Sequence, residues 1–267
     1  MRPFLKMHGL GNDFVIFDAR TEPLMMNEEL SSRVANRHRG VGCDQLIVLR
    51  ASKKADVFME IWNADGSRVG ACGNATRCVG MLILDELGQD EVSIETDAGL
   101  LSAKRAAAGI SVNMGPARTE WDQIPLAAEM ATDSADFEID GVSAPGCVNM
   151  GNPHAVFFVD NAEDEHIEVI GPQAELNELF PERVNASIAS VDDGIIRLRV
   201  WERGAGITEA CGTAACASVV AATRKGLIDR KATVRLDGGD LEVEWLKDGT
   251  VQMTGAATLV YKGEIAV

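Results

Sequence analysis

Aromatic residues are scarce in this sequence, where Phe, Trp and Tyr together make up 5% of 267 residues. Basic residues are also few, with 25 Lys and Arg against 41 Asp and Glu, which gives a formal net charge of −16. No stretch concentrates basic residues, so the chain lacks the positive surface that nucleic acids and anionic membranes attract. Apolar runs fall well short of the roughly 20 residues of a membrane-spanning helix. We therefore expect no nucleic-acid partner and no membrane span.

The six cysteines contain no CxxC pair, which argues against a zinc ribbon, and we expect no metal site. The opening residues, MRPFLKMHGLGNDF, lack the apolar core of a secretory signal peptide. This absence favours a cytoplasmic protein. In such a reducing compartment, cysteines are more often free, catalytic or metal-bound than paired.

The most informative feature present is an internal repeat. Short motifs of the first half recur in the second half, in the same order, at an offset of 139 or 140 residues. The recurring pairs are Gly11-Asn12 with Gly151-Asn152, Trp62 with Trp201, Cys72-Gly73 with Cys211-Gly212, Asp97 with Asp237, and Gly115 with Gly255. Several landmarks at one offset indicate two homologous halves.

Each half predicts a similar succession of strands around one helix. Alternating or apolar segments predict strands, at 14–17, 57–62, 92–96, 100–104 and 110–114 in the first half and at 155–158 and 195–201 in the second. A helix is expected to begin just after each Cys-Gly and to end near Gly88 or Gly226. Both helices are apolar nearly all round, which predicts that they are buried.

These elements predict an α+β fold of two pseudo-symmetric lobes, each a mixed sheet or barrel wrapped around a central helix. We place the N-terminal lobe at 1–115 and the C-terminal lobe at 116–256, with the active site in the cleft between them. Segment 116–150 contains three prolines and is expected to link the lobes and begin the second. The final segment, 257–267, has no counterpart in the first half and is expected to cross back to the first lobe.

Cys72 and Cys211 occupy matched positions at the two predicted helix starts. There, unpaired backbone N–H groups and the positive end of the helix dipole stabilise a thiolate and provide a carboxylate site. Inverting a Cα centre requires a base on one face and an acid on the other, and two identical side chains serve both directions. The pattern thus favours a two-thiol epimerase or racemase, while a disulfide or half of a metal site stays open as an alternative.

The other four cysteines are expected in the core. Cys78 and Cys216 follow the two candidate thiols by six and five residues, which turns them away from the helix-start sites. Cys43 and Cys147 have no placed partner and are assigned to the core too. Among the histidines, His154 stands out because it follows the repeated Gly-Asn directly.

Blocks along the whole chain resemble the diaminopimelate epimerase family. They are MHGLGNDF (7–14), DQL (44–46), NADGS (63–67) and CGN (72–74) in the first half, and GNPH (151–154), PERVN (181–185), ERGAG (202–206) and ACG (210–212) in the second. The resemblance implies interconversion of LL- and meso-2,6-diaminopimelate in bacterial lysine synthesis. It also implies a homodimer that uses no pyridoxal phosphate, no other cofactor and no metal.

The same resemblance implies the site residues. The catalytic group would be Cys72, Cys211, His154 and Glu202, with the latter two tuning the thiols. Asn12 and Gln45 would line the substrate pocket, and the N–H groups of Gly73, Asn74, Gly212 and Thr213 would hold the carboxylate at the reacting centre. Asn63, Asn152, Asn185 and Arg203 would read the distal end, with Glu202 also close to the substrate.

Simpler interpretations remain for some of these residues. Asn63-Ala64-Asp65-Gly66 also has the composition of a tight turn, and Glu202 with Arg203 can be a surface ion pair. A rival enzyme class is the proline racemase and hydroxyproline epimerase family, which resembles the same two-cysteine plan but needs no distal clamp. A thiol-based metal or redox-sensing module is the alternative outside enzymes.

Overall fold

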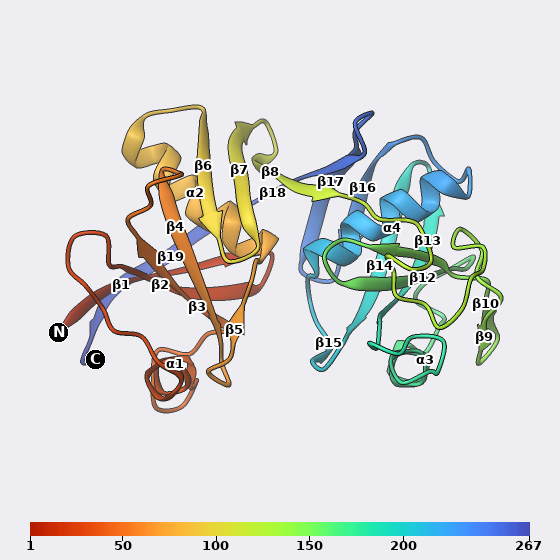
Figure 1. Ribbon diagram of the computed structural model, residues 1–267, viewed down its shortest axis with the longest axis horizontal. Coiled ribbons are helices and arrows are strands. Elements are labelled where there is room, and N and C mark those ends of the chain that lie inside the picture. Colours follow the sequence, from red (N-terminus) through yellow and green to blue (C-terminus); the bar gives the residue numbers. More distant parts are fainter. The chain divides into compact units, whose positions relative to one another are not determined.

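The computed structural model describes all 267 residues as a mixed α+β chain with four helices and 19 strands (Figure 1). It separates the chain into two compact units: unit 1 comprises residues 1–113 and 254–267, and unit 2 comprises residues 114–253. The α+β class predicted from the sequence is confirmed. Strands β8 (Gly109–Pro116) and β18 (Thr250–Gly255) carry the chain out of unit 1 and back into it.

Unit 1 is built from two helices and a set of curved strands. Its helices are α1 (Glu28–Ala35) and α2 (Gly73–Leu87). Besides most of β8, its strands are β1 (Arg2–Gly9), β2 (Asn12–Asp18), β3 (Gln45–Arg50), β4 (Val57–Asn63), β5 (Arg68–Val69), β6 (Glu91–Thr96), β7 (Gly99–Ala106) and β19 (Thr258–Ile265). Strand β1 pairs antiparallel with both β2 and β19, so the last strand of the chain lies beside the first.

Unit 2 contains α3 (Ile167–Glu175) and α4 (Gly212–Arg224). Besides most of β18, its strands are β9 (Glu138–Ile139), β10 (Val142–Ser143), β11 (Gly146–Asn149), β12 (Pro153–Phe158), β13 (Asn185–Asp192), β14 (Ile195–Glu202), β15 (Gly206–Ile207), β16 (Lys231–Leu236) and β17 (Gly239–Trp245). Segment 116–150 belongs to this unit, where Ile124, Leu126 and Ile139 are in its core.

The two units share one order of strand pairing. In unit 1, β2–β3 is parallel, β3–β4 antiparallel, β4–β6 parallel and β6–β7 antiparallel. In unit 2, β12–β13, β13–β14, β14–β16 and β16–β17 follow the same sequence of directions. The sequence repeat is therefore a repeat of structure.

Each unit buries one helix that begins directly after a cysteine. Helix α2 packs against β1, β6 and β7, and α4 packs against β11 to β14 and against β16 and β17. Gly80 lets α2 approach β7, because a Cβ at this position would lie 2.5 Å from the Cβ of Ala103. Gly88 ends α2 with φ 65°, a left-handed conformation that glycine adopts without steric cost. Each helix thus packs within its own unit, and the candidate thiols lie at the starts of these two helices.

Candidate functional site

Cys72 is the residue immediately before α2. Its backbone is extended, with φ −147° and ψ 116°, and its carbonyl accepts the first helical hydrogen bond from Thr76 N at 2.9 Å. The first N–H groups of a helix have no acceptor within the helix and give this end a positive potential. The thiol is partly exposed, and its Sγ lies 4.0 Å from Oδ1 of Asn12. A half-accessible sulfur at a helix start is suited to proton transfer.

Asn12, at the start of β2, reaches over to the same helix start. Its Oδ1 accepts a hydrogen bond from Nδ2 of Asn74 at 3.1 Å, and its own Nδ2 donates to Oδ2 of Asp44 at 3.0 Å. The structure thus brings together the predicted residues Asn12, Cys72 and Asn74. Asp44 joins them, although no role was predicted for it from the sequence.

Cys211 precedes α4 in the same way but is buried, with 5% of its surface exposed. Burial, together with the neighbouring Glu202 carboxylate, raises the pKa of the Cys211 thiol well above its usual value. The hydroxyl of Thr213, 3.4 Å from Sγ, and the N–H of Ala214 act in the opposite direction. Cys211 is therefore a protonated thiol at neutral pH.

Glu202 ends β14 and is held in place by a residue beyond the next turn. Oγ1 of Thr208 donates a hydrogen bond to Oε1 of Glu202. No ion pair joins Glu202 to Arg203, whose Nη1 donates to the carbonyl oxygen of Glu182 at 2.7 Å. The local ion pair considered from the sequence is therefore not formed.

His154 lies in β12 and is completely buried. Burial, together with the charge of Arg203, lowers the pKa of His154 to about 3, so the imidazole is neutral. Its Nε2 is 3.0 Å from Oδ1 of Asn152 and acts as the donor, because an amide oxygen only accepts. Nδ1 is then an acceptor, and this buried atom has no hydrogen-bond partner.

Gln45 and Asn63 face each other on β3 and β4. Nε2 of Gln45 donates to Oδ1 of Asn63 at 3.0 Å, and Nδ2 of Asn63 donates to Oγ of Ser67 at 3.0 Å. Asn63 also begins a tight turn closed by Gly66 N at 3.0 Å, so it serves the turn as well as the cluster. The buried Oε1 of Gln45 has no partner and is an available acceptor.

Asn185 is the counterpart of Gln45 in the repeat, 140 residues further on. It is 2% exposed; its Nδ2 donates to the carbonyl oxygen of Pro153 at 2.8 Å, and its Oδ1 accepts from Arg203 N at 3.0 Å. The side chain therefore connects β12 to the residue that follows β14. This arrangement fixes the backbone of Arg203.

The remaining predicted residues are the backbone donors at the two helix starts. Gly73 and Asn74 begin α2, and Gly212 and Thr213 begin α4. Six predicted residues thus lie in unit 1 and eight in unit 2. The predicted residues of unit 1 are Asn12, Gln45, Asn63, Cys72, Gly73 and Asn74, and those of unit 2 are Asn152, His154, Asn185, Glu202, Arg203, Cys211, Gly212 and Thr213.

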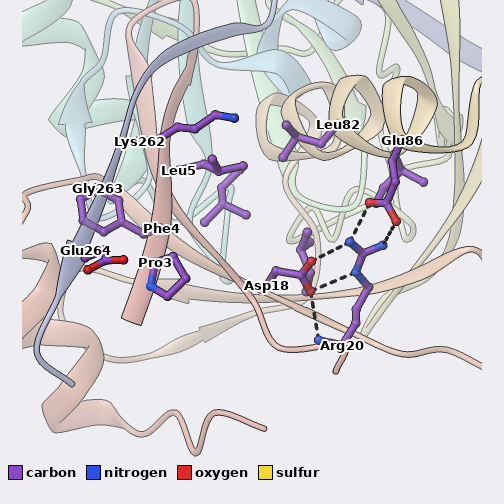
Figure 2. Close-up of a pocket in the computed structure, with 13 residues that line it drawn as sticks. Pro3, Phe4, Leu5, Asp18, Arg20, Leu82, Glu86, Lys262, Gly263 and Glu264 are labelled. Atoms are coloured by element: carbon purple, nitrogen blue, oxygen red, sulfur yellow. Dashed lines mark hydrogen bonds and ion pairs between the residues drawn. The ribbon is translucent and has the colours of Figure 1, made fainter. Parts of the chain in front are cut away.

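Two cavities of the structure are lined by none of the predicted site residues. One of about 490 Å³ in unit 1 is lined by apolar side chains such as Phe4 and Leu82 and edged by charged ones. Figure 2 shows Arg20 held between Asp18 and Glu86 at this edge, with contacts of 2.6–3.0 Å that already satisfy its guanidinium. A second cavity of about 540 Å³ in unit 2 is lined by residues of the segments 119–121 and 129–133 and by Arg224.

No group of three or more His, Cys, Asp or Glu side chains is placed to hold a metal ion. None of the helices is long and apolar enough to span a bilayer.

Three supporting residues were not predicted from the sequence. Asp44 holds Asn12, Thr208 holds Glu202, and the buried Glu175 accepts from Trp201 Nε1 at 2.7 Å and from Gly204 N at 3.0 Å. The N–H of a tryptophan that packs against a core usually finds a polar partner, so the partly buried Trp201 was the one available signal for Glu175. The partners of Asn12 and Glu202 had no comparable signal.

Several solved structures share the fold of this chain. A hydroxyproline epimerase from Agrobacterium vitis superposes with a TM-score of 0.68 at 15% identity, covering 99% of this chain and 90% of that one. A phenazine biosynthesis protein from Bacillus anthracis superposes with a TM-score of 0.68 at 18% identity, covering 100% and 99%. At these identities the similarity establishes the fold alone.

Sequence relatives define the family within this fold. The model of the diaminopimelate epimerase family matches residues 4–120 and 146–260. Diaminopimelate epimerases of Phenylobacterium zucineum and Rhodospirillum centenum are 53% and 51% identical over 270 aligned positions, covering 99% and 100% of this chain and 98% and 93% of theirs. The chain therefore belongs to the diaminopimelate epimerase family and is an isomerase, as the sequence motifs predicted.

Proposed function

We propose that this protein interconverts LL- and meso-2,6-diaminopimelate in lysine biosynthesis, using Cys72 and Cys211 as acid and base. The observation that carries the proposal is the matched position of the two thiols, each directly before a buried helix in one half of a structural repeat. Family membership over nearly the whole chain supplies the substrate.

The chemistry is a proton exchange at one carbon. A thiolate removes the Cα proton and becomes a thiol, and the opposite thiol gives its proton to the other face and becomes a thiolate. The burial of Cys211 and its contact with Glu202 make it the proton donor of the resting enzyme. Cys72 is then the base in that direction, and the roles reverse in the other. This scheme requires both thiols to reach the same Cα of one substrate.

The substrate carboxylate is assigned to the helix starts. The N–H groups of Gly73, Asn74, Gly212 and Thr213 are suited to this role because helix N-termini stabilise anions, including the enolate charge that develops as the proton leaves. Beside Cys72, the side chain of Asn12 contributes an amide oxygen. The unpaired Oε1 of Gln45 is suited to an ammonium group.

The distal amino-acid end is assigned to Asn63, Asn152, Asn185 and Arg203. Arginine binds a carboxylate with two parallel hydrogen bonds. Asn185 has one amide hydrogen and one oxygen lone pair beyond its two protein contacts, so it acts mainly by holding Arg203. His154 is assigned to holding Asn152 as a neutral donor and, with Glu202, to tuning the thiols.

We further propose that the protein is a cytoplasmic homodimer. Three consecutive apolar residues of β19, Leu259, Val260 and Tyr261, are 37%, 54% and 46% exposed, which is unusual for a strand without a covering partner. Sedimentation equilibrium of the intact protein measures the oligomeric state, and a monomer at micromolar concentration would contradict this part of the proposal.

The decisive experiment is incubation with LL-diaminopimelate in heavy water. The meso product is expected to carry deuterium at the inverted Cα, because the proton delivered comes from a solvent-exchanged thiol. Unlabelled product would contradict the two-thiol scheme, and no product would contradict the assigned substrate. L-Proline and trans-4-hydroxy-L-proline in the same assay test the racemase alternative, and neither is expected to epimerise.

A second experiment tests the alternative of a metal or redox module. The proposal assigns all the chemistry to protein groups, so activity is expected to survive a chelator and to be lost on treatment with iodoacetamide. The purified protein is expected to lack the absorbance band of a pyridoxal aldimine. Loss of activity with the chelator alone would overturn the cofactor-free part of the proposal.

A further inference from the structure

The amide of Asn12 has a fixed orientation toward Cys72. Its Nδ2 donates to Asp44 Oδ2 at 3.0 Å, while its Oδ1 accepts from Asn74 Nδ2 at 3.1 Å and lies 4.0 Å from Cys72 Sγ. An ionised carboxylate accepts hydrogen bonds and donates none, so Asp44 requires the nitrogen end of the amide on its side. The oxygen end must then face the helix start and the sulfur.

Asp44 is itself held by several contacts. Its Oδ1 accepts from Arg37 Nη2 at 2.7 Å, and its Oδ2 also accepts from Asp13 N at 3.0 Å. Asp44 N donates back to Asp13 Oδ1 at 2.9 Å, which locks the two residues together. Burial opposes ionisation of Asp13, but hydrogen bonds from Arg37 and Lys6 outweigh it and lower the Asp13 pKa to about 2. Two carboxylates and two cations thus form a charge-balanced support behind Asn12.

The second half of the repeat supports its own asparagine differently. Asn152, the counterpart of Asn12, has its Oδ1 bound by His154 Nε2 at 3.0 Å. The position equivalent to Asp44, 140 residues later, is the buried Val184. In unit 1 a carboxylate accepts from the amide nitrogen of Asn12, whereas in unit 2 a histidine donates to the amide oxygen of Asn152. Asp44 is therefore not a framework residue common to both halves, but a feature of the half that carries Cys72.

We propose that Asp44 is a positioning residue for Cys72, acting through Asn12. This inference rests on the proposed function, in which Cys72 removes the substrate proton. A thiolate that has taken up a proton gains an S–H group, and Oδ1 of Asn12 is the acceptor that stabilises it. If the amide were inverted, its N–H would face the sulfur and stabilise the thiolate instead, making Cys72 a weaker base.

The test compares Asp44→Asn, Asn12→Ala and the double variant in the full-length protein. The first readout is the rate of iodoacetamide labelling of Cys72 against pH, followed by peptide mass spectrometry. Asp44→Asn frees the Asn12 amide to invert, so the pH of half-maximal labelling is expected to fall by about one unit, the size of one ordinary hydrogen bond. The second readout is turnover, and kcat is expected to fall about tenfold with little change in KM.

The double variant shows whether Asp44 acts through Asn12. Asp44→Asn is expected to change neither readout further once Asn12 is alanine, because coupled residues have non-additive effects. Asp44→Ala should shift the labelling profile in the same direction as Asp44→Asn. Asp18→Asn is the matched control. Asp18, the last residue of β2, also forms an ion pair with an arginine, Arg20, but has no contact with Asn12. The labelling profile of Cys72 in this variant should equal that of the parent.

Two results would overturn the proposal: an unchanged Cys72 profile in Asp44→Asn, or an equal shift whether position 12 is Asn or Ala. The labelling experiment needs no substrate, so it tests the link from Asp44 to Cys72 even if diaminopimelate is not turned over. Conversely, full epimerase activity with no such link would overturn this inference alone and leave the proposed function intact.

Discussion

The carboxylate of Glu202 lies beside the buried thiol of Cys211 and raises its pKa. Thr208 holds that carboxylate from its other side. A negative charge beside a buried thiol disfavours the thiolate, so the pair keeps its proton on sulfur until an acceptor arrives. Cys72, by contrast, is partly exposed and has an amide oxygen as its neighbour. The two halves of the repeat thus give their thiols different environments.

Glu202→Gln is predicted to make Cys211 more acidic. Burial remains and keeps the pKa raised, but the charge contribution of Glu202 is lost, so labelling of Cys211 by a small alkylating reagent at pH 8 should accelerate roughly tenfold. Epimerase activity should fall at the same time. Labelling rates resolved by peptide mass spectrometry provide the measurement. Glu209→Gln, an exposed glutamate two residues before Cys211, is the control and should leave the rate unchanged.

Replacing either thiol with a hydroxyl is predicted to stop catalysis. Cys72→Ser and Cys211→Ser should each lower kcat by about 10²- to 10⁴-fold, since every turnover needs both an acid and a base. Circular dichroism and thermal unfolding should stay close to the parent. Near-normal turnover in Cys211→Ser would contradict the two-thiol scheme.

The controls for the thiol variants lie on the same helices. Cys78 and Cys216 are completely buried, and burial raises the pKa of Cys78 to about 12. Cys78→Ala and Cys216→Ala should therefore keep turnover near the parent value, at a stability cost of about 1 kcal/mol. A large loss of activity in either would show that the core cysteines take part in the reaction.

Local sequence signals predicted the fold well. The Cys-Gly pairs marked where α2 and α4 begin, Gly88 marked the end of α2, and the repeat anticipated the shared pairing order. These features depend on neighbouring residues and on periodicity, which a single sequence contains.

The supporting contacts of the site could not be predicted in the same way. Asn12 and Asp44 are 32 residues apart, and Trp201 and Glu175 are 26 apart. Each pair meets because of strand register and loop conformation, which no local pattern specifies. The neutral state of His154 likewise follows from complete burial, which its sequence position did not indicate.

Asn185→Ala is predicted to destabilise the protein rather than only weaken substrate binding. The change leaves the carbonyl of Pro153 and the N–H of Arg203 without their present partner, which should cost about 1–3 kcal/mol in the free energy of unfolding. Urea denaturation measures this cost. Gln123→Ala, at an exposed amide residue of the same unit, should change stability by less than about 0.5 kcal/mol. A raised KM with unchanged stability would show instead that Asn185 mainly contacts substrate.

His154 is predicted to make stability depend on pH between its unfolded and folded pKa values. The unfolded residue binds a proton near pH 6.5, whereas burial holds the folded pKa at about 3, so the unfolded state binds more protons between these values. The contribution of His154 to the free energy of unfolding is therefore fully present above about pH 6.5 and is lost as the pH falls toward 3, at up to about 1.4 kcal/mol per pH unit.

Urea denaturation from pH 4.5 to 7.5 should show this loss of stability in the parent. His154→Gln, which stays neutral and can still donate to Asn152, should show a smaller slope, while His166→Gln at an exposed position should match the parent. Equal slopes in the parent and in His154→Gln would mean that His154 is not held neutral in the folded protein.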